Sequence, residues 1–77
     1  MNEYDVLFLW HDEGQVWTAE NDEIPFIIQE KTLERLMKRV PGVAAEMLEI
    51  NGKDCKNANL NYIVKGIKAA ELVEAVA

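Results

Sequence analysis

The stretch that decides the fold is YDVLFLWHDEGQVWTAE, residues 4–20. It contains two runs rich in β-branched and aromatic residues, and a polar segment that includes Gly14 separates them. Such runs are typical of β-strands, and a short polar segment with glycine between them is typical of a hairpin turn. We therefore predict strands over Tyr4–His11 and Gln15–Glu20, with Gly14 adopting the positive φ angle that the turn needs.

The side chains of this hairpin also predict its register. If positions 13–14 form a two-residue tip, Trp10 lies opposite Trp17 and Phe8 lies opposite Ala19. Alternate residues of a strand point to opposite faces, so these aromatic residues share one face, which we take as the core side. The other face of the hairpin then carries three apolar residues: Leu7, Leu9 and Val16.

A third strand and a long helix are predicted next. Pro25 cannot donate a ladder hydrogen bond and fits the edge or start of a strand, so the third strand is placed at Phe26–Glu30. Thr32 has the residue type of a helix N-cap. After it, apolar residues recur every three to four positions, which predicts an amphipathic helix. Its apolar stripe comprises Leu33, Leu36, Met37, Val40, Ala44, Met47 and Leu48.

Two features divide and end this helix. Pro41-Gly42 lies in its middle, which predicts either a kink or two abutting helices; the unbroken phase of the stripe favours a kink. Asn51-Gly52 predicts its end, because glycine readily adopts the left-handed conformation that terminates helices.

The remaining segments complete an α+β fold. A polar loop is predicted over residues 53–59, a fourth strand over Leu60–Lys65, and a short C-terminal helix from the spacing of four apolar residues, namely Ala69, Leu72, Val73 and Val76. The expected architecture is a three-stranded antiparallel sheet with one long helix packed on it, plus the fourth strand (β-β-β-α-β) and the C-terminal helix. We expect a single domain over residues 1–77.

Composition narrows the classes of function. The formal net charge of −6 argues against direct nucleic-acid binding, which needs a basic surface. The acidity suits either a basic protein partner or solubility alone. Polar residues interrupt every apolar run, and the first residues lack a basic start, so we expect a cytoplasmic protein that does not enter the membrane. Cys55 is the one cysteine and fits a free surface thiol.

No convincing catalytic or metal-binding set is present. The sequence His11-Asp12-Glu13 brings a histidine beside carboxylates, but it falls at the predicted hairpin tip. Asp5 could act with Glu20 as in metal-dependent nucleases, but the other carboxylates, Asp22 and Glu23, lie in a predicted turn with no reason to meet Asp5. We therefore expect no enzyme activity, no metal and no cofactor.

The face opposite the tryptophans is the candidate binding surface. Leu7, Leu9 and Val16 are covered either by the C-terminal segment of the chain or by another molecule, and an exposed apolar patch marks an interaction site. Acidic residues follow closely in sequence. We therefore predict the partner contacts as Leu7, Leu9 and Val16, with Glu20, Asp22 and Glu23 as acidic complement, and we expect the chain to form a homodimer or higher homo-oligomer.

Five segments resemble the HicB-type antitoxin fold, and the similarity is greatest to a short bacterial branch of that family. The segments are Val6–Trp10, Val16–Ala19, Asp22–Pro25, Thr32–Leu36 and Leu48–Asn51. The resemblance implies a partial ribonuclease H-like fold. It also implies a non-catalytic protein that binds and masks a small basic RNA-cleaving toxin of HicA type.

The chain departs from the family pattern at three places. Phe26 stands where a glycine usually follows the proline, and Glu30-Lys31 replaces a glycine before the helix. After Gly52 the sequence is too short for a helix-turn-helix, so no separate DNA-binding domain is expected. The alternative function is an orphan homo-oligomeric domain that has no toxin partner.

Overall fold

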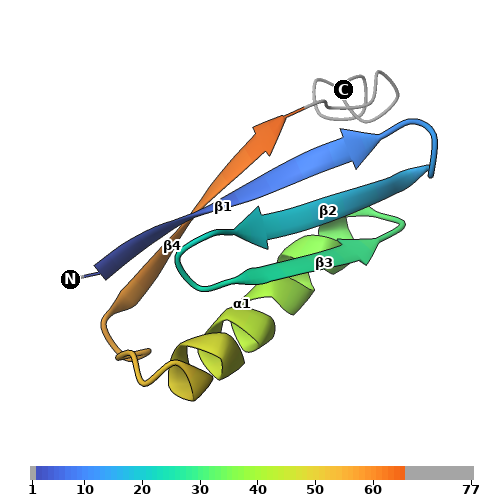
Figure 1. The fold of residues 1–77 in the computed structure, drawn as a ribbon. Coiled ribbons are helices and arrows are strands. Elements are labelled where there is room, and N and C mark those ends of the chain that lie inside the picture. The colour runs from blue at the N-terminus through green and yellow to red at the C-terminus, as the bar shows by residue number, and fades with distance from the viewer. Residues whose placement is uncertain (1, 66–77) are drawn as a thin grey trace.

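The computed structural model describes residues 2–65. They form a four-stranded sheet with one helix across one of its faces (Figure 1). The strands are β1 (Asn2–His11), β2 (Val16–Asn21), β3 (Phe26–Glu30) and β4 (Ala58–Lys65), and the helix is α1 (Leu33–Ile50). The strands lie in the order β3-β2-β1-β4. The pairs β1–β2 and β2–β3 are antiparallel, whereas β4 runs parallel to β1.

The predicted α+β class and the order β-β-β-α-β are confirmed, but the three-stranded antiparallel sheet is wrong. The sheet is mixed, because the fourth strand joins it directly beside β1. A parallel neighbour needs a long crossover connection, and α1 with its following loop provides one. β4 begins at Ala58, two residues before the predicted start. The predicted C-terminal helix lies outside the described residues.

The register of the first hairpin is confirmed. Trp10 pairs with Trp17, and Phe8 pairs with Ala19. The two indole rings are tilted by 55° to each other with centroids 5.5 Å apart. Tilted packing at this separation is a favourable arrangement for aromatic side chains.

The predicted position of the positive φ angle in the turn is wrong. Gln15, and not Gly14, adopts it, with φ of 53°. The turn spans four residues between His11 and Val16, and its last residue must reverse the chain into β2. The Gln15 side chain donates a hydrogen bond of 2.6 Å to the Asp12 carbonyl, which holds it in this conformation.

Gln15→Gly is expected to stabilise the protein by about 0.5 kcal/mol, a rise in Tm of roughly 2–4 °C. Glycine removes the steric strain of the left-handed conformation, about 1 kcal/mol, and this exceeds the loss of one exposed hydrogen bond. Thermal unfolding followed by circular dichroism measures the change. Gly14→Ala is the control, because Gly14 has no positive φ and an added Cβ would make ordinary contact with Val16. A lower Tm for Gln15→Gly would contradict the expectation.

The core lies between the sheet and α1. Its fully buried centre comprises Val6, Phe8, Trp17, Ala19, Leu36 and Val40. A second cluster, formed by Tyr4, Ile24, Ala44 and Leu48, continues it toward the far end of the helix. These residues are the apolar positions of alternate strand residues and of the helical stripe, as the periodicity predicts.

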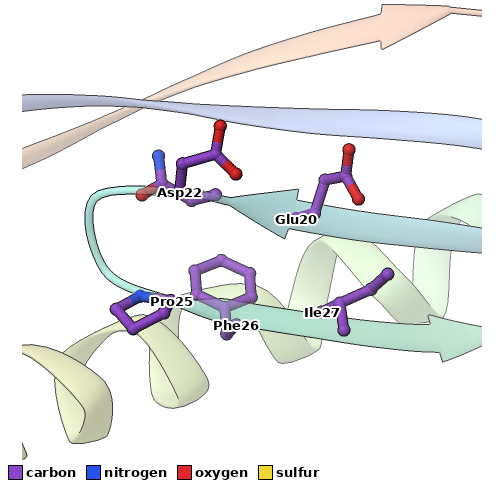
Figure 2. Close-up of a pocket in the computed structure, with 6 residues that line it drawn as sticks. Glu20, Asp22, Pro25, Phe26 and Ile27 are labelled. Carbon is purple, nitrogen blue, oxygen red and sulfur yellow. The ribbon is translucent and has the colours of Figure 1, made fainter.

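The turn Asp22–Pro25 joins β2 to β3 (Figure 2). Pro25 stands directly before β3, in agreement with the prediction that it starts or borders that strand. Ile24 is fully buried in the second core cluster and fixes the turn against α1. The turn therefore holds its acidic residues at a defined place beside the sheet.

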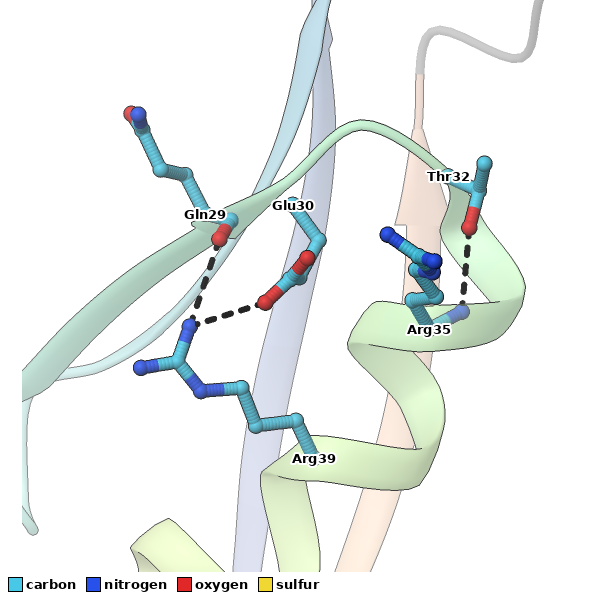
Figure 3. Close-up of polar contacts among 5 residues, drawn as sticks. All are labelled: Gln29, Glu30, Thr32, Arg35 and Arg39. Carbon is cyan, nitrogen blue, oxygen red and sulfur yellow. Dashed lines mark hydrogen bonds and ion pairs between the residues drawn. The ribbon is translucent and has the colours of Figure 1, made fainter.

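The ends of α1 are those predicted. The Thr32 hydroxyl accepts a hydrogen bond of 3.2 Å from the Arg35 amide, so Thr32 is the N-cap (Figure 3). At the other end Gly52 has φ of 68°. The amides of Gly52 and Lys53 donate to carbonyls of the last helical turn at 3.0 and 2.8 Å, the pattern of a Schellman motif.

α1 passes through Pro41 as one helix of 18 residues, so the alternative of two abutting helices is wrong. Val40 and Ala44, on either side of the proline, are both buried on the same stripe. The helix packs mainly on β3 and β2. It therefore leaves the opposite face of the sheet uncovered by any helix among the described residues.

Candidate functional site

The face of the sheet opposite α1, here called the open face, is the candidate site. Strand alternation and the observed registers assign its side chains. They are Glu3, Asp5, Leu7, Leu9 and His11 of β1, Val16, Thr18 and Glu20 of β2, Ile27 and Gln29 of β3, and Asn59, Asn61, Ile63 and Lys65 of β4. The open face therefore runs across all four strands.

The centre of the open face is apolar. Leu7, Leu9 and Val16 are half-buried by their neighbours on the sheet. Ile27 on one side is 66% exposed and Ile63 on the other is 39% exposed. Covering branched aliphatic side chains of such exposure removes apolar surface from water and lowers the free energy, so the face is suited to burial by a partner.

One end of the open face is acidic. A shallow depression of about 230 Å³ is lined there by Asp5, Leu7, Glu20, Asn21, Asp22 and Ile63. Three carboxylates thus surround a floor that contains two aliphatic side chains. Since no lysine or arginine lines the depression, its charge is uncompensated by its own lining.

A second depression, of about 460 Å³, lies on the other side of the same acidic residues (Figure 2). Its lining combines Glu20, Asn21 and Asp22 with Pro25, Phe26 and Ile27. In Figure 2 the carboxylates of Glu20 and Asp22 project in the same direction from the end of β2 and the turn. Glu20 and Asp22 therefore line both depressions.

The Asn21 side chain stabilises this end of the open face through two hydrogen bonds. The residue is only 8% exposed, and its side chain connects β1 to the turn between β2 and β3. The Nδ2 group donates a hydrogen bond of 2.6 Å to the Asp5 carbonyl, and Oδ1 accepts one of 2.8 Å from the Ile24 amide. The bridge fixes β1 relative to the turn that carries Asp22, and so sets the separation of the acidic residues.

Asn21→Ala is expected to lower the free energy of unfolding by about 2–3 kcal/mol, because the buried Ile24 amide and the partly buried Asp5 carbonyl lose their partner. Urea unfolding measures the loss. Asn59→Ala is the matched control: Asn59 is exposed and makes one long hydrogen bond, 3.4 Å to Glu3, so its removal should cost under about 0.5 kcal/mol. Equal midpoints for the two variants would contradict the proposed bridge.

Of the groups considered for catalysis, Asp5 lines the same depression as Glu20 and Asp22, contrary to the prediction that Asp22 has no reason to meet it, whereas His11 and Cys55 lie elsewhere. His11 Nε2 is 2.8 Å from the Thr18 hydroxyl, and Asp5 Oδ1 accepts a hydrogen bond of 3.2 Å from Asn61. Cys55 is free and exposed in the loop after α1. Within residues 2–65, no three or more His, Cys, Asp or Glu side chains converge in a way that could hold a metal ion.

The six predicted contact residues divide into three groups. Leu7, Glu20 and Asp22 meet at the acidic depression. Leu9 and Val16 lie on the same face, nearer the first hairpin, where Leu9 pairs with Thr18 and Val16 with His11. Glu23 is exposed in the turn, and its carbonyl accepts a hydrogen bond of 3.2 Å from Lys53, on the side of the loop that follows α1.

Comparison with family models gives one match, to the Domain of unknown function (DUF1902), over residues 3–73. The chain belongs to the DUF1902 family. The DUF1902 match covers the helix and all four strands except the first residue of β1, and thus the whole of the open face. Comparisons with curated proteins and with solved structures returned no match. Among the described residues, no helix is long and apolar enough to cross a membrane.

Asp5, Ile27 and Ile63 are open-face residues that the sequence did not indicate as contacts. Asp5 could have been found, because it alternates with Leu7 and Leu9 on β1. Ile63 could not, since its place beside Leu7 depends on the parallel pairing of β4 with β1. The alternation of β3 gave Ile27 no preferred face without the register of β2 and β3.

Proposed function

We propose that this DUF1902 domain is a non-catalytic protein-binding module and that its open face binds a small basic protein of HicA toxin type. The observation that carries the proposal is the juxtaposition on one face of an apolar centre and an acidic end. Leu7 belongs to both, since it lines the acidic depression and lies in the row of half-buried aliphatic residues.

The two parts of the face have different physical roles in binding. The apolar centre supplies most of the affinity, because covering Ile27, Ile63 and Leu9 removes aliphatic surface from water. The carboxylates of Asp5, Glu20 and Asp22 select a cationic partner and raise the rate of association. A net charge of −6 adds to this long-range attraction.

The chemical class of the partner is supported by the resemblance to HicB antitoxins. Members of that family have a partial ribonuclease H-like fold, and they bind and mask a small basic RNA-cleaving toxin of HicA type. The observed order β-β-β-α-β agrees with such a domain. A basic toxin is complementary in sign to the acidic end of the open face.

The proposal is tested with a purified toxin of HicA type. Isothermal titration calorimetry at low and at moderate salt should give saturable binding that weakens as salt increases. An RNA-cleavage assay should show loss of toxin activity when the domain is added. Absence of binding at both salt concentrations would contradict the proposal.

A second candidate is a homo-oligomeric domain without a toxin partner, and the exposure of Tyr62 and Ile63 on the edge strand β4 favours it. In that case sedimentation velocity would give a dimer or larger species, and the calorimetric titration with a basic toxin would give no heat of binding. The two measurements together separate the candidates.

A further inference from the structure

We infer that the outer edge of β4 is a self-association site, at which β4 of a second copy of this chain pairs antiparallel and extends the sheet. β4 is an eight-residue strand whose described partner is β1 alone. An edge of this length presents a row of unsatisfied amides and carbonyls, which is a template for another strand.

The backbone geometry identifies the groups that would bind. The Asn57 carbonyl accepts a hydrogen bond of 3.1 Å from the Asn2 amide, so Asn57 directs its main-chain groups toward β1. Successive residues of a strand alternate in this direction. The odd-numbered residues of β4 therefore bond to β1, whereas Leu60, Tyr62 and Val64 direct their amides and carbonyls outward.

Charge favours a second copy as the occupant of this edge. The seven residues 58–64 contain no charged side chain, in a protein whose net charge is −6. Two acidic molecules repel each other over most of their surfaces, and a neutral strip is where they approach at least electrostatic cost.

At the opposite edge of the sheet, a charged side chain hinders the addition of another strand. At β3, the Arg39 guanidinium from α1 donates to the Gln29 carbonyl at 3.4 Å and forms an ion pair of 3.1 Å with Glu30 (Figure 3). A charged side chain across a short edge strand is a common means of preventing strand addition. Among the described contacts along residues 58–64, no charged side chain crosses the outer edge of β4 in this way. β4 is therefore the edge at which a second copy can pair.

The core side of β4 is also incompletely covered. α1 packs mainly on β2 and β3, and a shallow apolar groove of about 190 Å³ lies between α1 and β4, lined in part by Pro41, Leu48 and Leu60. Tyr62 reaches α1 through a hydrogen bond of 3.3 Å from its hydroxyl to the Met37 carbonyl, yet it remains 37% exposed. A neighbouring strand would cover Leu60, Tyr62 and Val64 from the side.

A two-fold axis perpendicular to the sheet satisfies these conditions. With Tyr62 opposite Tyr62 of the second copy, the outward groups form about six main-chain hydrogen bonds. On the open face, Lys65 then lies opposite Asn59 of the second copy, which is next to Glu3 of that copy. This places a lysine near a carboxylate twice across the axis. Both open faces point to the same side, so the dimer leaves the proposed basic-protein surface free.

Hydrogen exchange by NMR tests the inference directly, at two protein concentrations chosen on either side of the dissociation constant measured by sedimentation equilibrium. In the dimer the amides of Leu60, Tyr62 and Val64 should be protected, and this protection should fall on dilution. The amides of Asn59, Asn61 and Ile63, which bond to β1, should stay protected at both concentrations. A monomer in sedimentation, or unprotected even-numbered amides in the dimer, would overturn the inference.

Val64→Pro supplies the mutational test, because it removes an outward amide without touching the β1–β4 ladder. It should raise the dimer dissociation constant at least about tenfold, whereas Val64→Ala, which keeps the amide, should stay dimeric. If Val64→Pro remains as tightly dimeric as the parent, the inference fails. Protection of the even-numbered amides that does not change on dilution would assign the edge to the chain's own residues 66–77 and also overturn it.

Self-association through β4 and toxin binding by the open face can be tested independently of each other. Leu9→Asp on the open face should abolish binding of the basic toxin and leave the dimer intact, while Val64→Pro should do the reverse. Loss of both properties in either variant, with the fold preserved by circular dichroism, would contradict the assignment of two distinct surfaces.

Discussion

Trp17→Ala is expected to lower the free energy of unfolding by about 3–5 kcal/mol, the largest effect of any single substitution considered in this protein. Trp17 is fully buried in the strand between β1 and β3, and its ring meets that of Trp10. A domain of 77 residues has a total stability of about 4–12 kcal/mol. The loss is therefore at least about a quarter of the total stability, and at the lower end of the range it removes all of it.

Urea unfolding followed by circular dichroism measures this change, with Ile27→Ala as control. Ile27 lies on the adjacent strand but is 66% exposed, so its truncation should cost under about 0.5 kcal/mol. A Trp17→Ala variant that unfolds within about 1 kcal/mol of the parent would show that the tryptophan pair is not the centre of the core.

Simultaneous Glu20→Lys and Asp22→Lys substitutions are expected to weaken binding of the basic partner at least about 100-fold, or roughly 2.7 kcal/mol. Each reversal changes the charge by two, so the formal net charge moves from −6 to −2. Most of the loss should fall on the association rate, since the acids act through steering, and the salt dependence of binding should largely vanish.

Glu46→Lys with Glu49→Lys is the matched control for this prediction. Both residues are exposed on α1, on the other side of the molecule from the open face, and the substitutions change net charge by the same amount. Surface plasmon resonance gives the two rates for each variant. Equal weakening by the two double variants would mean that net charge, and not the acidic end of the open face, governs association.

The hairpin and the helix could be predicted because their signals are local. Trp10, Trp17, Phe8 and Ala19 give a consistent face only in one register, and that register also places Leu7 opposite Glu20. The stripe from Leu33 and the caps at Thr32 and Gly52 define the helix in the same way. In each case neighbours in sequence make the contacts that stabilise the element.

The position of β4 could not be predicted because it depends on contacts distant in sequence. A strand that follows a helix can join either edge of a sheet, and nothing within Leu60–Lys65 specifies β1 as its neighbour. That pairing brings Ile63 beside Leu7 and so completes the acidic depression. The sequence therefore predicts candidate contacts on the hairpin and the turn that follows it, from Leu7 to Glu23, but none on the side that β4 contributes.

The most direct test of the proposed function compares two aspartate substitutions in binding to the HicA-type toxin by calorimetry. Leu9→Asp places a charge at the apolar centre of the open face, whereas Ile50→Asp places the same charge at a residue of α1 that is 69% exposed. We expect loss of measurable binding for Leu9→Asp and affinity within about threefold of the parent for Ile50→Asp, both variants being folded. Parental affinity in Leu9→Asp would contradict the claim that the open face binds the partner.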